Sequence, residues 1–486
     1  MKIATASQIR ELDQFTIENE PIPSLSLMER ASQAFVKTFL EEVELEGKTV
    51  VIFCGAGNNG GDGLAIARLL AQRELNVVAY RVEAKRYTED NKRNARRFET
   101  TNIITSIQDI LPMDKNTVII DALIGSGLKE QPRGLYKNII EHINNSDAYV
   151  VAVDIPSGLY SDVMTEEGNV IVRAALTITF ELPKLSFLMP ETEAFVGVLK
   201  IVSIVLHPEG VARLKTDYHF ISTDVPPTLE KRSRFAHKGT FGHALLIGGS
   251  YGKIGAIQLA SKACLRSGIG LLSIQAPRCG YTILQTSVPE AMLVEEASKK
   301  NLQTPIAITS YSAIGIGPGL GLAKKTRKWL KYFLNLIQRP LVLDADALNA
   351  LAMHPKWFKK LPQSTIITPH PKEFQRLFGG SMNRFTQLDL AKKKAKEHSI
   401  IIVLKGAYTA IVNSDAQVYF NNTGNSGMAT GGSGDVLTGI ITGYLAQGIK
   451  PIDAAILGVY NHGLAADKAY ESRGNGLIAS DIIDCF

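Results

Sequence analysis

Cysteine is scarce in this sequence, with four residues among 486, at Cys54, Cys264, Cys279 and Cys485. No two of them form a CxxC pair, so the sequence indicates neither a zinc site nor a thiol–disulfide redox motif. Scattered cysteines of this kind are typical of reduced thiols in the cytosol. We therefore expect a cytoplasmic protein.

Long apolar runs and a strong charge of one sign are also missing. No apolar stretch approaches the roughly 20 residues needed to span a bilayer, and the first residues, "MKIATASQIRELDQF", lack the apolar core of a signal peptide. The net charge is +6, and basic clusters such as "KRYTEDNKRNARR" and "KKKAK" contain acids or have helical spacing. Because such clusters are typical of solvated helix faces, we expect no nucleic-acid partner and no membrane partner.

The length of the chain favours two domains, since 486 residues exceed one typical core. In both halves short β-branched runs, such as "KTVVIFC" and "HALLIGGS", alternate with amphipathic helical patterns. This alternation predicts an α/β fold, with parallel sheets covered by helices on both faces. The stretch "TAIVNSDAQVYFNN" predicts a hairpin. The polar, proline-containing segment 216–236 is the expected linker between domains 1–215 and 237–486.

The first glycine turn, "GAGNNGGDGLAIAR" (Gly55 to Arg68), stands between a strand and a helix. It matches GxGxxG, which suggests a dinucleotide fold with a diphosphate at the helix N-terminus. Asp62 argues against this, because at the opening of the helix its carboxylate would compete with phosphate for the N–H donors. Asn58 and Asn59 suit a cation with hydroxyl or amide groups better. In the structural alternative, the asparagines make the turn and Asp62 caps the helix.

Two further acids end strands in the first half. Asp121 in "DALIGSGLKEQPRG" precedes a glycine loop, and Asp154 in "VDIPSGL" precedes Pro156 and Ser157. The carboxyl ends of parallel strands converge on one crevice. We therefore expect Asp62, Asp121 and Asp154 to face a common pocket.

Four motifs of the first half, "LMERA", "GAGNNGGDGLAIAR", "DALIGSGL" and "VDIPSGL", together resemble the NAD(P)HX epimerase domain of bifunctional nicotinamide-nucleotide repair proteins. The resemblance implies a Rossmann-like three-layer sandwich and a K⁺ ion held by Asn59, Asp121 and Ser157. It implies that Asp154 contacts the damaged nicotinamide ring and transfers protons. The substrate residues that it implies are Asn58, Asn59, Gly60, Gly61, Asp62, Gly125, Ser126, Gly127, Leu128, Lys129, Glu130 and Gln131.

The second glycine turn, "NSGMATGGSGDVLTG", runs into an apolar helix. It has no Walker lysine, and "GGSYGKIG" lacks P-loop spacing, so a P-loop is not supported. The backbone N–H groups of Gly431 to Gly434 at a helix N-terminus nevertheless predict an anion cradle. Asp435 follows at once, where it could accept a proton from a hydroxyl that attacks phosphorus. The alternative is a glycine turn with Asp435 as the helix cap.

Polar residues end other strands of the second half, namely Lys405 and Gly406 in "VLKGAYT", His370 and Glu373 in "TPHPKEF", and Asp344 and Asp346 in "DADAL". A further glycine loop, "GIGPGLG", also follows a strand. A lone histidine such as His370 is more often structural than catalytic, and Asp346 could cap a helix that starts at Ala347.

Six motifs, "HKGTFGHALLIGGS", "GIGPGLG", "DADALN", "TPHPKEF", "VLKG" and "GGSGDVLTG", are similar to the ADP-dependent NAD(P)HX dehydratase domain of the ribokinase-like superfamily. The similarity begins near His237 and implies a ribokinase-like α/β domain, with Asp435 as the catalytic base. It implies Mg²⁺ bound through water near Glu373. The implied substrate residues are Ala256, Gly319, His370, Pro371, Lys372, Glu373, Phe374, Gln375, Arg376 and Asp435. The implied ADP residues are Lys405, Gly406, Ala407, Tyr408, Thr409, Asn425, Ser426, Gly427, Met428, Ala429, Thr430, Gly431, Gly432, Ser433 and Gly434.

The two resemblances imply a bifunctional enzyme that epimerises the R and S forms of NADHX or NADPHX and dehydrates the S form with ADP as co-substrate. The motifs are compatible with ADP or ATP, and with NADHX or NADPHX. One alternative is a vitamin-type small-molecule kinase fused to a non-catalytic binding domain, because such kinases share the "GSGD" turn. In another, both turns are only helix starts, which leaves the strand-end residues unexplained. We expect a homo-oligomer, because soluble domains of this kind often assemble symmetrically.

Overall fold

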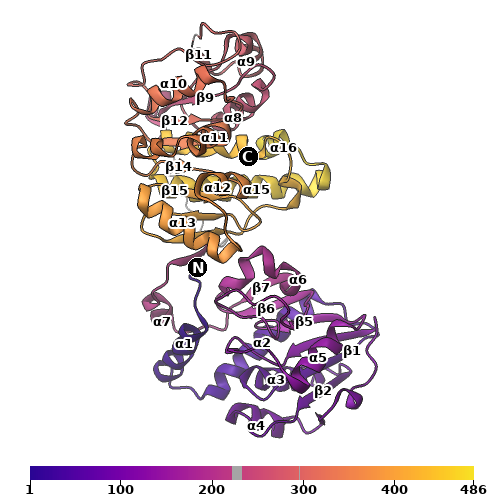
Figure 1. Ribbon diagram of the computed structural model, residues 1–486. Helices are drawn as coiled ribbons and strands as arrows, with labels where there is room; N and C mark the ends of the chain where they lie inside the picture. Colours follow the sequence, from indigo (N-terminus) through magenta and orange to yellow (C-terminus); the bar gives the residue numbers. More distant parts are fainter. Residues whose placement is uncertain (222–231, 295) are drawn as a thin grey trace. The chain divides into compact units, whose positions relative to one another are not determined.

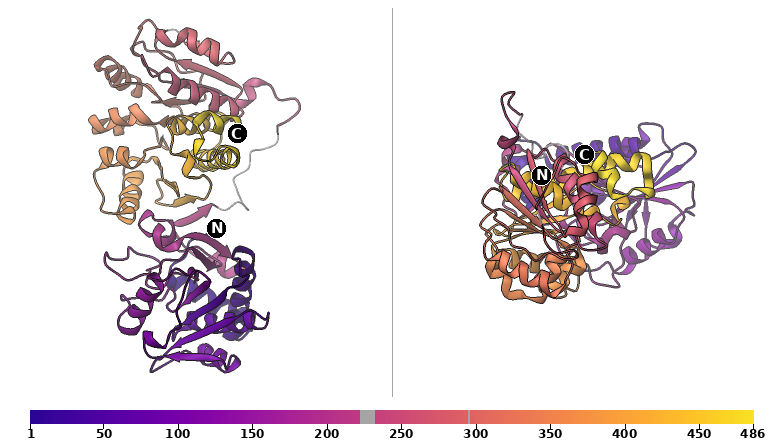
Figure 2. Two further views of the ribbon diagram at one scale, coloured as in Figure 1. Left: turned by 90° about the vertical axis from the view of Figure 1, so that its right-hand side faces the viewer. Right: turned by 90° about the horizontal axis from the view of Figure 1, so that it is seen from above.

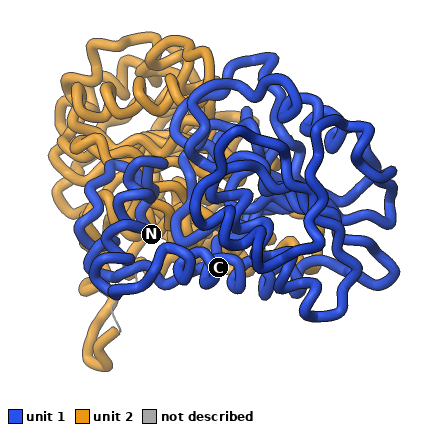
Figure 3. The backbone as a smooth tube through the Cα atoms, turned by 90° about the horizontal axis from the view of Figure 1, so that it is seen from below, with its two compact units in different colours: residues 1–218 blue, residues 219–486 orange. Residues whose placement is uncertain are grey.

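The chain divides into two compact units. The computed structural model describes residues 1–221, 232–294 and 296–486, and the units are Met1–Tyr218 and His219–Phe486 (Figure 3). This division falls inside the segment 216–236 that the sequence predicts as a linker. Residues 222–231 of that segment lie outside the described residues, whereas Tyr218–Ile221 forms strand β8.

The first unit is built on a seven-stranded sheet with the order β3-β2-β1-β4-β5-β6-β7 (Figure 1). Every neighbouring pair in it is parallel, as the continuous apolar runs of the sequence predict. The strands are β1 (Thr49–Cys54), β2 (Val77–Val82), β3 (Thr101–Ile104), β4 (Thr117–Ala122), β5 (Tyr149–Val153), β6 (Leu176–Phe180) and β7 (Val198–Val202).

Helices cover both faces of this sheet, because successive residues of a strand point to opposite sides. Val50 and Ile52 of β1 belong to the core that α2 and α3 close. Val51 and Phe53 belong to the core that α5 closes on the other face, which makes the predicted three-layer sandwich. The helices of the unit are α1 (Ala6–Asn19), α2 (Ser24–Glu42), α3 (Asn58–Ala71), α4 (Glu89–Arg97), α5 (Gly134–Asn144), α6 (Glu193–Val196) and α7 (Pro208–Arg213).

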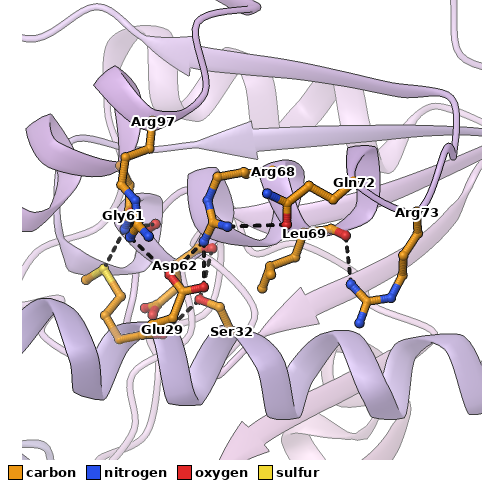
Figure 4. Close-up of polar contacts among 11 residues, drawn as sticks. Glu29, Ser32, Gly61, Asp62, Arg68, Leu69, Gln72, Arg73 and Arg97 are labelled. Atoms are coloured by element: carbon orange, nitrogen blue, oxygen red, sulfur yellow. Dashed lines mark hydrogen bonds and ion pairs between the residues drawn. The ribbon is translucent and has the colours of Figure 1, made fainter.

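Polar contacts as well as apolar ones fix α3 against α2 (Figure 4). The Arg68 guanidinium donates to both carboxylate oxygens of Glu29, each at 2.6 Å. The buried Ser32 hydroxyl donates to the Met28 carbonyl at 2.9 Å and lies 3.5 Å from the Asp62 carbonyl oxygen. These contacts fix the second and third turns of α3 against α2, and so help to position the first glycine turn.

The second unit contains a ten-stranded sheet with the order β11-β10-β9-β12-β13-β14-β15-β16-β17-β8. The pairings from β11 to β15 are parallel, and β16 pairs antiparallel with both β15 and β17. The predicted hairpin is therefore confirmed. The remaining strands are β9 (His243–Ile247), β10 (Leu271–Gln275), β11 (Met292–Val294), β12 (Ala313–Ile316), β13 (Leu341–Leu343), β14 (Ile366–Ile367), β15 (Ile401–Leu404), β16 (Ala410–Val412) and β17 (Val418–Asn421).

The connections between these parallel strands run in two directions along the sheet. From β9 to β10 the chain moves one way through α8, and from β12 to β13 it moves the other way through α10. Because such connections are right-handed, α8 and α10 cover opposite faces, and α8 shares its core with α14 and α15 (Figure 2). The helices are α8 (Ile254–Arg266), α9 (Tyr281–Ser287), α10 (Lys324–Leu334), α11 (Ala345–Met353), α12 (Pro371–Phe378), α13 (Arg384–His398), α14 (Ser433–Ala446), α15 (Pro451–Arg473) and α16 (Ala479–Asp484).

In each unit the strand order reverses at one point, between β1 and β4 in the first and between β9 and β12 in the second. A crevice opens at the carboxyl ends of such strands, because the loops that follow them leave in opposite directions. Glycine-rich segments follow these four strands, at Gly55, Gly125, Gly248 and Gly317, whereas the second glycine turn, Gly431 to Gly434, comes after β17. The topology therefore locates one candidate site in each unit.

The described helices and the cysteines bear on two expectations drawn from composition. None of the helices among the described residues combines the length and the apolar character that crossing a bilayer requires. All four cysteines are free thiols, and Cys54 and Cys264 are buried.

Helix α14 packs on α8 at a glycine, which gives a test of this contact. A Cβ at Gly439 would lie 2.0 Å from the Ala260 carbonyl oxygen, so Gly439→Ala must push the helices apart. We expect it to lower the free energy of unfolding by about 1–3 kcal/mol. Both tryptophans, Trp329 and Trp357, belong to the second unit, so tryptophan fluorescence during urea unfolding reports on that unit.

Gly255→Ala in α8 is the matched control, because an added Cβ there meets nothing within 4 Å. We expect it to be neutral or slightly stabilising, since alanine favours a helix more than glycine does. Equal urea midpoints for the two variants would contradict the close contact at Gly439.

Candidate active sites

The first cavity lies where the strand order of the first unit reverses, and its volume is about 1110 Å³. Its walls come from the loops after β1 and β4, from Asp154 after β5, and from helices α1 and α2. Gly60 and Gly61, which were predicted to contact substrate, do not line it. The predicted residues that line it are Asn58, Asn59, Asp62, Gly125, Ser126, Gly127, Leu128, Lys129, Glu130, Gln131 and Asp154.

Glycines in the first turn let backbone segments approach more closely than a side chain would permit. A Cβ at Gly55 would lie 1.8 Å from the Leu123 carbonyl oxygen, and one at Gly60 would lie 1.9 Å from the Gly55 carbonyl oxygen. The turn is therefore held directly against the loop that follows β4. Gly60 serves this close approach from outside the cavity.

Asp62 lies in the second turn of α3. The helix begins at Asn58 and has Gly57 as its N-cap, so the prediction that Asp62 opens or caps this helix is wrong. Burial, reinforced by the negative charges of Asp154 and Asp13, raises the pKa of Asp62 well above its ordinary value. Burial therefore favours the protonated form of Asp62, in which the carboxyl can donate a hydrogen bond to a ligand.

Asp121 lies near the end of β4 and is fully buried. The groups that donate hydrogen bonds to its carboxylate are all neutral. The Ser157 N–H donates to Oδ2 at 2.7 Å, and the Ser157 hydroxyl and the Leu123 N–H donate to Oδ1 at 2.6 and 3.2 Å. Burial raises the pKa of Asp121 to about 6, against the effect of these bonds. A Cβ at Gly125 would lie 3.2 Å from the Cβ of Asn59. Asn59, Asp121 and Ser157 thus gather around the loop after β4.

Asp154 follows β5 with a left-handed backbone, at φ +65°, a conformation that is costly for a residue with a side chain. Its Oδ1 accepts a hydrogen bond from the Lys184 ammonium and, at 3.1 Å each, from the Thr179 hydroxyl and the Phe180 N–H. The Lys184 side chain is only 2% exposed. Among the described residues none donates to Oδ2, so this oxygen is available to a ligand in the cavity.

The second cavity lies where the strand order of the second unit reverses, and its volume is about 470 Å³. The predicted residues Ala256, Gly319, Glu373 and Asp435 line it together. Phe374 is fully buried in the core, so its side chain does not face a ligand. The predicted substrate residues that do not line this cavity are His370, Pro371, Lys372, Phe374, Gln375 and Arg376. Its walls also include Gly252, Lys253, Gly255, Ala345, Asp346 and Asn349.

The second glycine turn brings the start of α14 beside a lysine. Gly432 is the N-cap of this helix at φ +94°, a conformation that favours glycine. A Cβ at Gly434 would lie 3.3 Å from Lys405 Nζ, so the two segments predicted to bind ADP, 405–409 and 425–434, meet here. Free backbone N–H groups and an ammonium together favour an anion such as phosphate.

Lys405 is held in place by a buried carboxylate. Its ammonium lies 3.0 Å from Asp344 Oδ1, and the Asp344 side chain is 3% exposed. The other oxygen of Asp344 accepts a hydrogen bond from the Thr438 hydroxyl at 2.8 Å. This network joins the ends of β13 and β15 to the first turns of α14, which fixes the position of the ammonium.

Asp435 lies in the first turn of α14 and in the wall of the second cavity. Burial first, and then the negative charges of Asp344, Asp346 and Glu373, raise the pKa of Asp435 to about 7, against the opposing charge of Lys405. A carboxyl with a pKa near neutrality suits general acid–base chemistry. Because the N-cap of α14 is a glycine, the alternative in which Asp435 caps the helix is wrong.

Two other residues predicted at strand ends lie at or near the start of a helix. Helix α11 begins at Ala345, after an aspartate N-cap, so the interpretation of Asp346 as the cap of a later-starting helix is wrong. His370 is the N-cap of α12. Its ring Nδ1 accepts a hydrogen bond from the Lys372 backbone N–H at 3.2 Å, and its backbone N–H donates to Glu373 Oε2 at 3.0 Å. The position of His370 therefore has a structural explanation.

The two units match different protein families. Residues 24–186 match the family described as YjeF-related protein N-terminus, and residues 244–486 match the family described as NAD(P)H-hydrate dehydratase. The chain is 35% identical to the bifunctional NAD(P)H-hydrate repair enzyme Nnr of Moorella thermoacetica, over 100% of this chain and 96% of that protein. The chain belongs to the bifunctional NAD(P)H-hydrate repair enzyme family. The resemblance drawn from the sequence motifs is thereby confirmed.

A second member of the repair-enzyme family and one solved structure are also similar to this chain. The Nnr protein of Coxiella burnetii is 37% identical, over 98% of this chain and 96% of its own length. The ADP/ATP-dependent NAD(P)H-hydrate dehydratase from Bacillus subtilis, co-crystallized with ATP/Mg²⁺, is 31% identical, with a TM-score of 0.46. That alignment covers 54% of this chain and 97% of the Bacillus chain.

The donor groups of each cavity can be compared with the cations that the sequence resemblance implies for this repair enzyme. In the described part of the chain, no three His, Cys, Asp or Glu side chains gather closely enough to hold a metal ion directly. Within the described ranges, the buried Asp121 carboxylate receives hydrogen bonds only from neutral groups, so its negative charge has no cationic side chain beside it, and this oxygen-bearing cluster fits a monovalent cation. The surplus of carboxylates around Asp435 fits Mg²⁺ held through water.

Reasoning from sequence missed Asp13 and Lys184, which act at the first cavity. Asp13 on α1 lines the cavity, and Lys184 pairs with Asp154 beneath it. The lysine carries a signal, because it stands in the apolar stretch "ELPKLSFLMP", where a buried ammonium requires a partner. Asp13 carries no such sequence signal, because an amphipathic helix pattern does not show which edge of the sheet the helix covers.

The ion pair between Lys184 and Asp154 gives a second test. We expect Lys184→Met to lower the free energy of unfolding of the first unit by about 3 kcal/mol, because it leaves a carboxylate without its cation in a largely buried place. Adding Asp154→Asn removes that charge and should restore most of the loss. Circular dichroism during urea unfolding follows both units. Tryptophan fluorescence identifies the transition of the second unit, so the remaining transition in circular dichroism belongs to the first. A double variant less stable than Lys184→Met would contradict the pairing.

Proposed function

We propose that this chain restores hydrated NADH and NADPH in two steps, at two separate sites. The first unit interconverts the R and S forms of NADHX or NADPHX, and the second unit dehydrates the S form with consumption of ADP. The observation that carries the proposal is Asp435, a carboxyl with a pKa of about 7 beside the anion-binding start of α14. Membership of the repair-enzyme family and the different chemistry of the two cavities support the division of labour.

The first unit would act on the hydroxyl at carbon six of the nicotinamide ring, which can lie on either face. Interconversion requires ring opening, or loss and return of the hydroxyl, and both routes move protons locally. Asp154 offers Oδ2 for this, while Lys184 holds Oδ1. Residues 125–131, together with Asn58 and Asp62, would bind and orient the rest of the substrate.

In the same proposal, Asn59, Asp121 and Ser157 would hold K⁺. When bound, the cation supplies positive charge that offsets the buried Asp121 carboxylate and favours nearby substrate oxygens. Ser157 links this cluster to the substrate loop, because its hydroxyl accepts a hydrogen bond from the Ile124 N–H at 2.8 Å. The cluster therefore orients the loop from residue 125 onward.

The second unit would turn a poor leaving group into a good one. Asp435 accepts the proton of the ring hydroxyl while the hydroxyl oxygen attacks the terminal phosphorus of ADP. The bond between this phosphorus and the oxygen that bridges to AMP then breaks. Lys405 and the N–H groups at the start of α14 stabilise the negative charge that moves onto AMP. Phosphate then leaves carbon six as the ring-nitrogen lone pair forms a C=N bond. Loss of the proton on carbon five completes NADH or NADPH.

Glu373 and its neighbouring carboxylates would hold Mg²⁺ through water in the second cavity. When bound, Mg²⁺ neutralises charge on the phosphate oxygens. Lys253 lies on the same wall, 3.5 Å from Asp346 Oδ2, and adds a cation at the mouth of the site. The chain itself thus provides the base, the anion cradle and the charge balance.

A direct assay tests the proposed reaction. Purified protein supplied with an epimer mixture of NADHX, Mg²⁺ and ADP should regenerate the near-ultraviolet absorbance of reduced nicotinamide until both epimers are consumed. AMP and inorganic phosphate should form in amounts equal to NADH, because the lost water ends in phosphate. Accumulation of a phosphorylated small molecule without NADH would overturn the proposal and favour the vitamin-type kinase alternative.

Asp435 gives a sharper test within the second unit. As a base it must be ionised, so the dehydration rate should fall as the pH drops below about 7 and level off above it. We expect Asp435→Asn to slow dehydration by about 10²–10⁴-fold and to leave epimer exchange unchanged. Asp415→Asn, the same change in an exposed hairpin turn, is the control and should keep full activity. A flat rate profile across neutral pH in the unmodified protein would contradict the role of Asp435.

A further inference from the structure

The first cavity holds a carboxyl group that the proposed epimerase reaction has not used. Asp13 lies on α1, and its half-buried side chain lines the cavity. Within the described part of the chain, no residue forms a hydrogen bond or an ion pair with this carboxyl. Polar groups taken out of water usually have a protein partner, so Asp13 is a group left free toward the cavity.

Helix α1 is firmly placed at this site. Its N-cap Thr5 and Gln8 form a capping box, and the Ala6 N–H donates to Asp162 Oδ2 at 3.0 Å. The cavity-lining residues of the helix have the spacing of one helical face, and they are Ile9, Arg10, Asp13, Gln14 and Ile17.

The same face reaches the predicted substrate loop. Arg10 Nη2 lies 3.7 Å from the position of a Cβ at Gly127, within the loop 125–131. Asp13 is therefore one turn along the helix from a guanidinium that contacts this loop. Its carboxyl belongs to the same cavity as Asp154.

The charged groups that act on Asp13 come from elements distant in sequence, namely Asp62 on α3, Asp154 after β5 and Lys184 after β6. Burial, followed by the negative charge of Asp154, raises the pKa of Asp13 to about 6, and the Lys184 ammonium opposes this. Asp13 can therefore gain and lose a proton near neutral pH. Burial and neighbouring negative charges also raise the pKa of Asp62 well above its ordinary value.

Inversion at carbon six by loss and return of the hydroxyl needs proton transfer on both faces of the ring. As the C–O bond breaks, the oxygen takes a proton and leaves as water, and the ring-nitrogen lone pair forms a C=N bond. Water then adds to the opposite face and gives a proton to a base, and the electron pair returns to nitrogen. A single carboxyl would have to reach both faces, whereas two carboxyls from different walls of the cavity would not.

We propose that Asp13 and Asp154 are the two proton-transfer groups of the first cavity, each serving one face of the nicotinamide ring. This inference rests on the proposed epimerase function. In one direction Asp13 gives its proton to the leaving hydroxyl, and Asp154 Oδ2 takes a proton from the returning water. In the other direction the roles are exchanged, and proton exchange with solvent restores the starting state. Lys184 is a positioning residue, because it holds Oδ1 and leaves Oδ2 to the substrate.

The test measures epimer exchange in the full chain without ADP, so that the second unit does not turn over. Proton NMR at carbon six follows the conversion of one purified NADHX epimer into the other. We expect Asp13→Asn to slow exchange at least about 100-fold, with ADP-dependent dehydration of the S epimer unchanged. Glu11→Gln is the matched control, since it makes the same charge change at an exposed position of α1, and it should leave exchange at the original rate.

The pH dependence separates proton transfer from a structural role. In the unmodified protein the exchange rate should change near pH 6, where Asp13 titrates, and Asp13→Glu should keep measurable exchange with that inflection displaced. Unchanged exchange in Asp13→Asn, or an undisplaced inflection in Asp13→Glu, overturns the inference but leaves the proposed function intact. No exchange in the unmodified protein overturns the proposed function itself. Circular dichroism checks that each variant folds. If Asp13→Asn does not fold, the inflection in the pH profile of Asp13→Glu decides whether Asp13 transfers protons.

Discussion

The reversal of strand order is the constraint on which both sites depend. A parallel sheet brings the carboxyl ends of its strands to one edge, and only where neighbouring connections diverge does that edge open into a crevice. In the first unit this happens between β1 and β4, and in the second between β9 and β12. Glycines at these points let the neighbouring loops pack directly against each other, as the 1.8 Å distance from a Cβ at Gly55 to the Leu123 carbonyl oxygen illustrates.

The same topology supports different chemistry because different groups surround each crevice. In the first unit carboxyls dominate, and the Lys184 ammonium fixes one oxygen of Asp154 while the other stays free. In the second unit the start of α14 and Lys405 create a place for an anion next to Asp435. Burial raises the pKa values of Asp62, Asp121 and Asp435 in both units. Exclusion of water thus gives each crevice carboxyl groups with raised pKa values, although the other groups around them differ.

Much of this arrangement could be predicted from sequence, because strand periodicity and glycine turns are local signals. The parallel sheets, the hairpin and the strand-end positions of Asp121 and Asp154 follow from such signals. The capping roles predicted for Asp62 and Asp346 were wrong, because a helix starts where its first N–H groups become satisfied, and that depends on neighbouring backbone. Asp13 and Lys184 belong to the first cavity only through tertiary packing, which no pattern along the chain records.

Both units belong to one polypeptide, and this has a consequence for the cell. Translation of a single message delivers the two activities in equal numbers, so no separate regulation is needed to keep them matched. Any imbalance between supply of the S form and its removal must then come from the turnover rates alone. A mutation that slows the first unit without unfolding it would leave the R form behind, whereas one that slows the second unit would accumulate both forms.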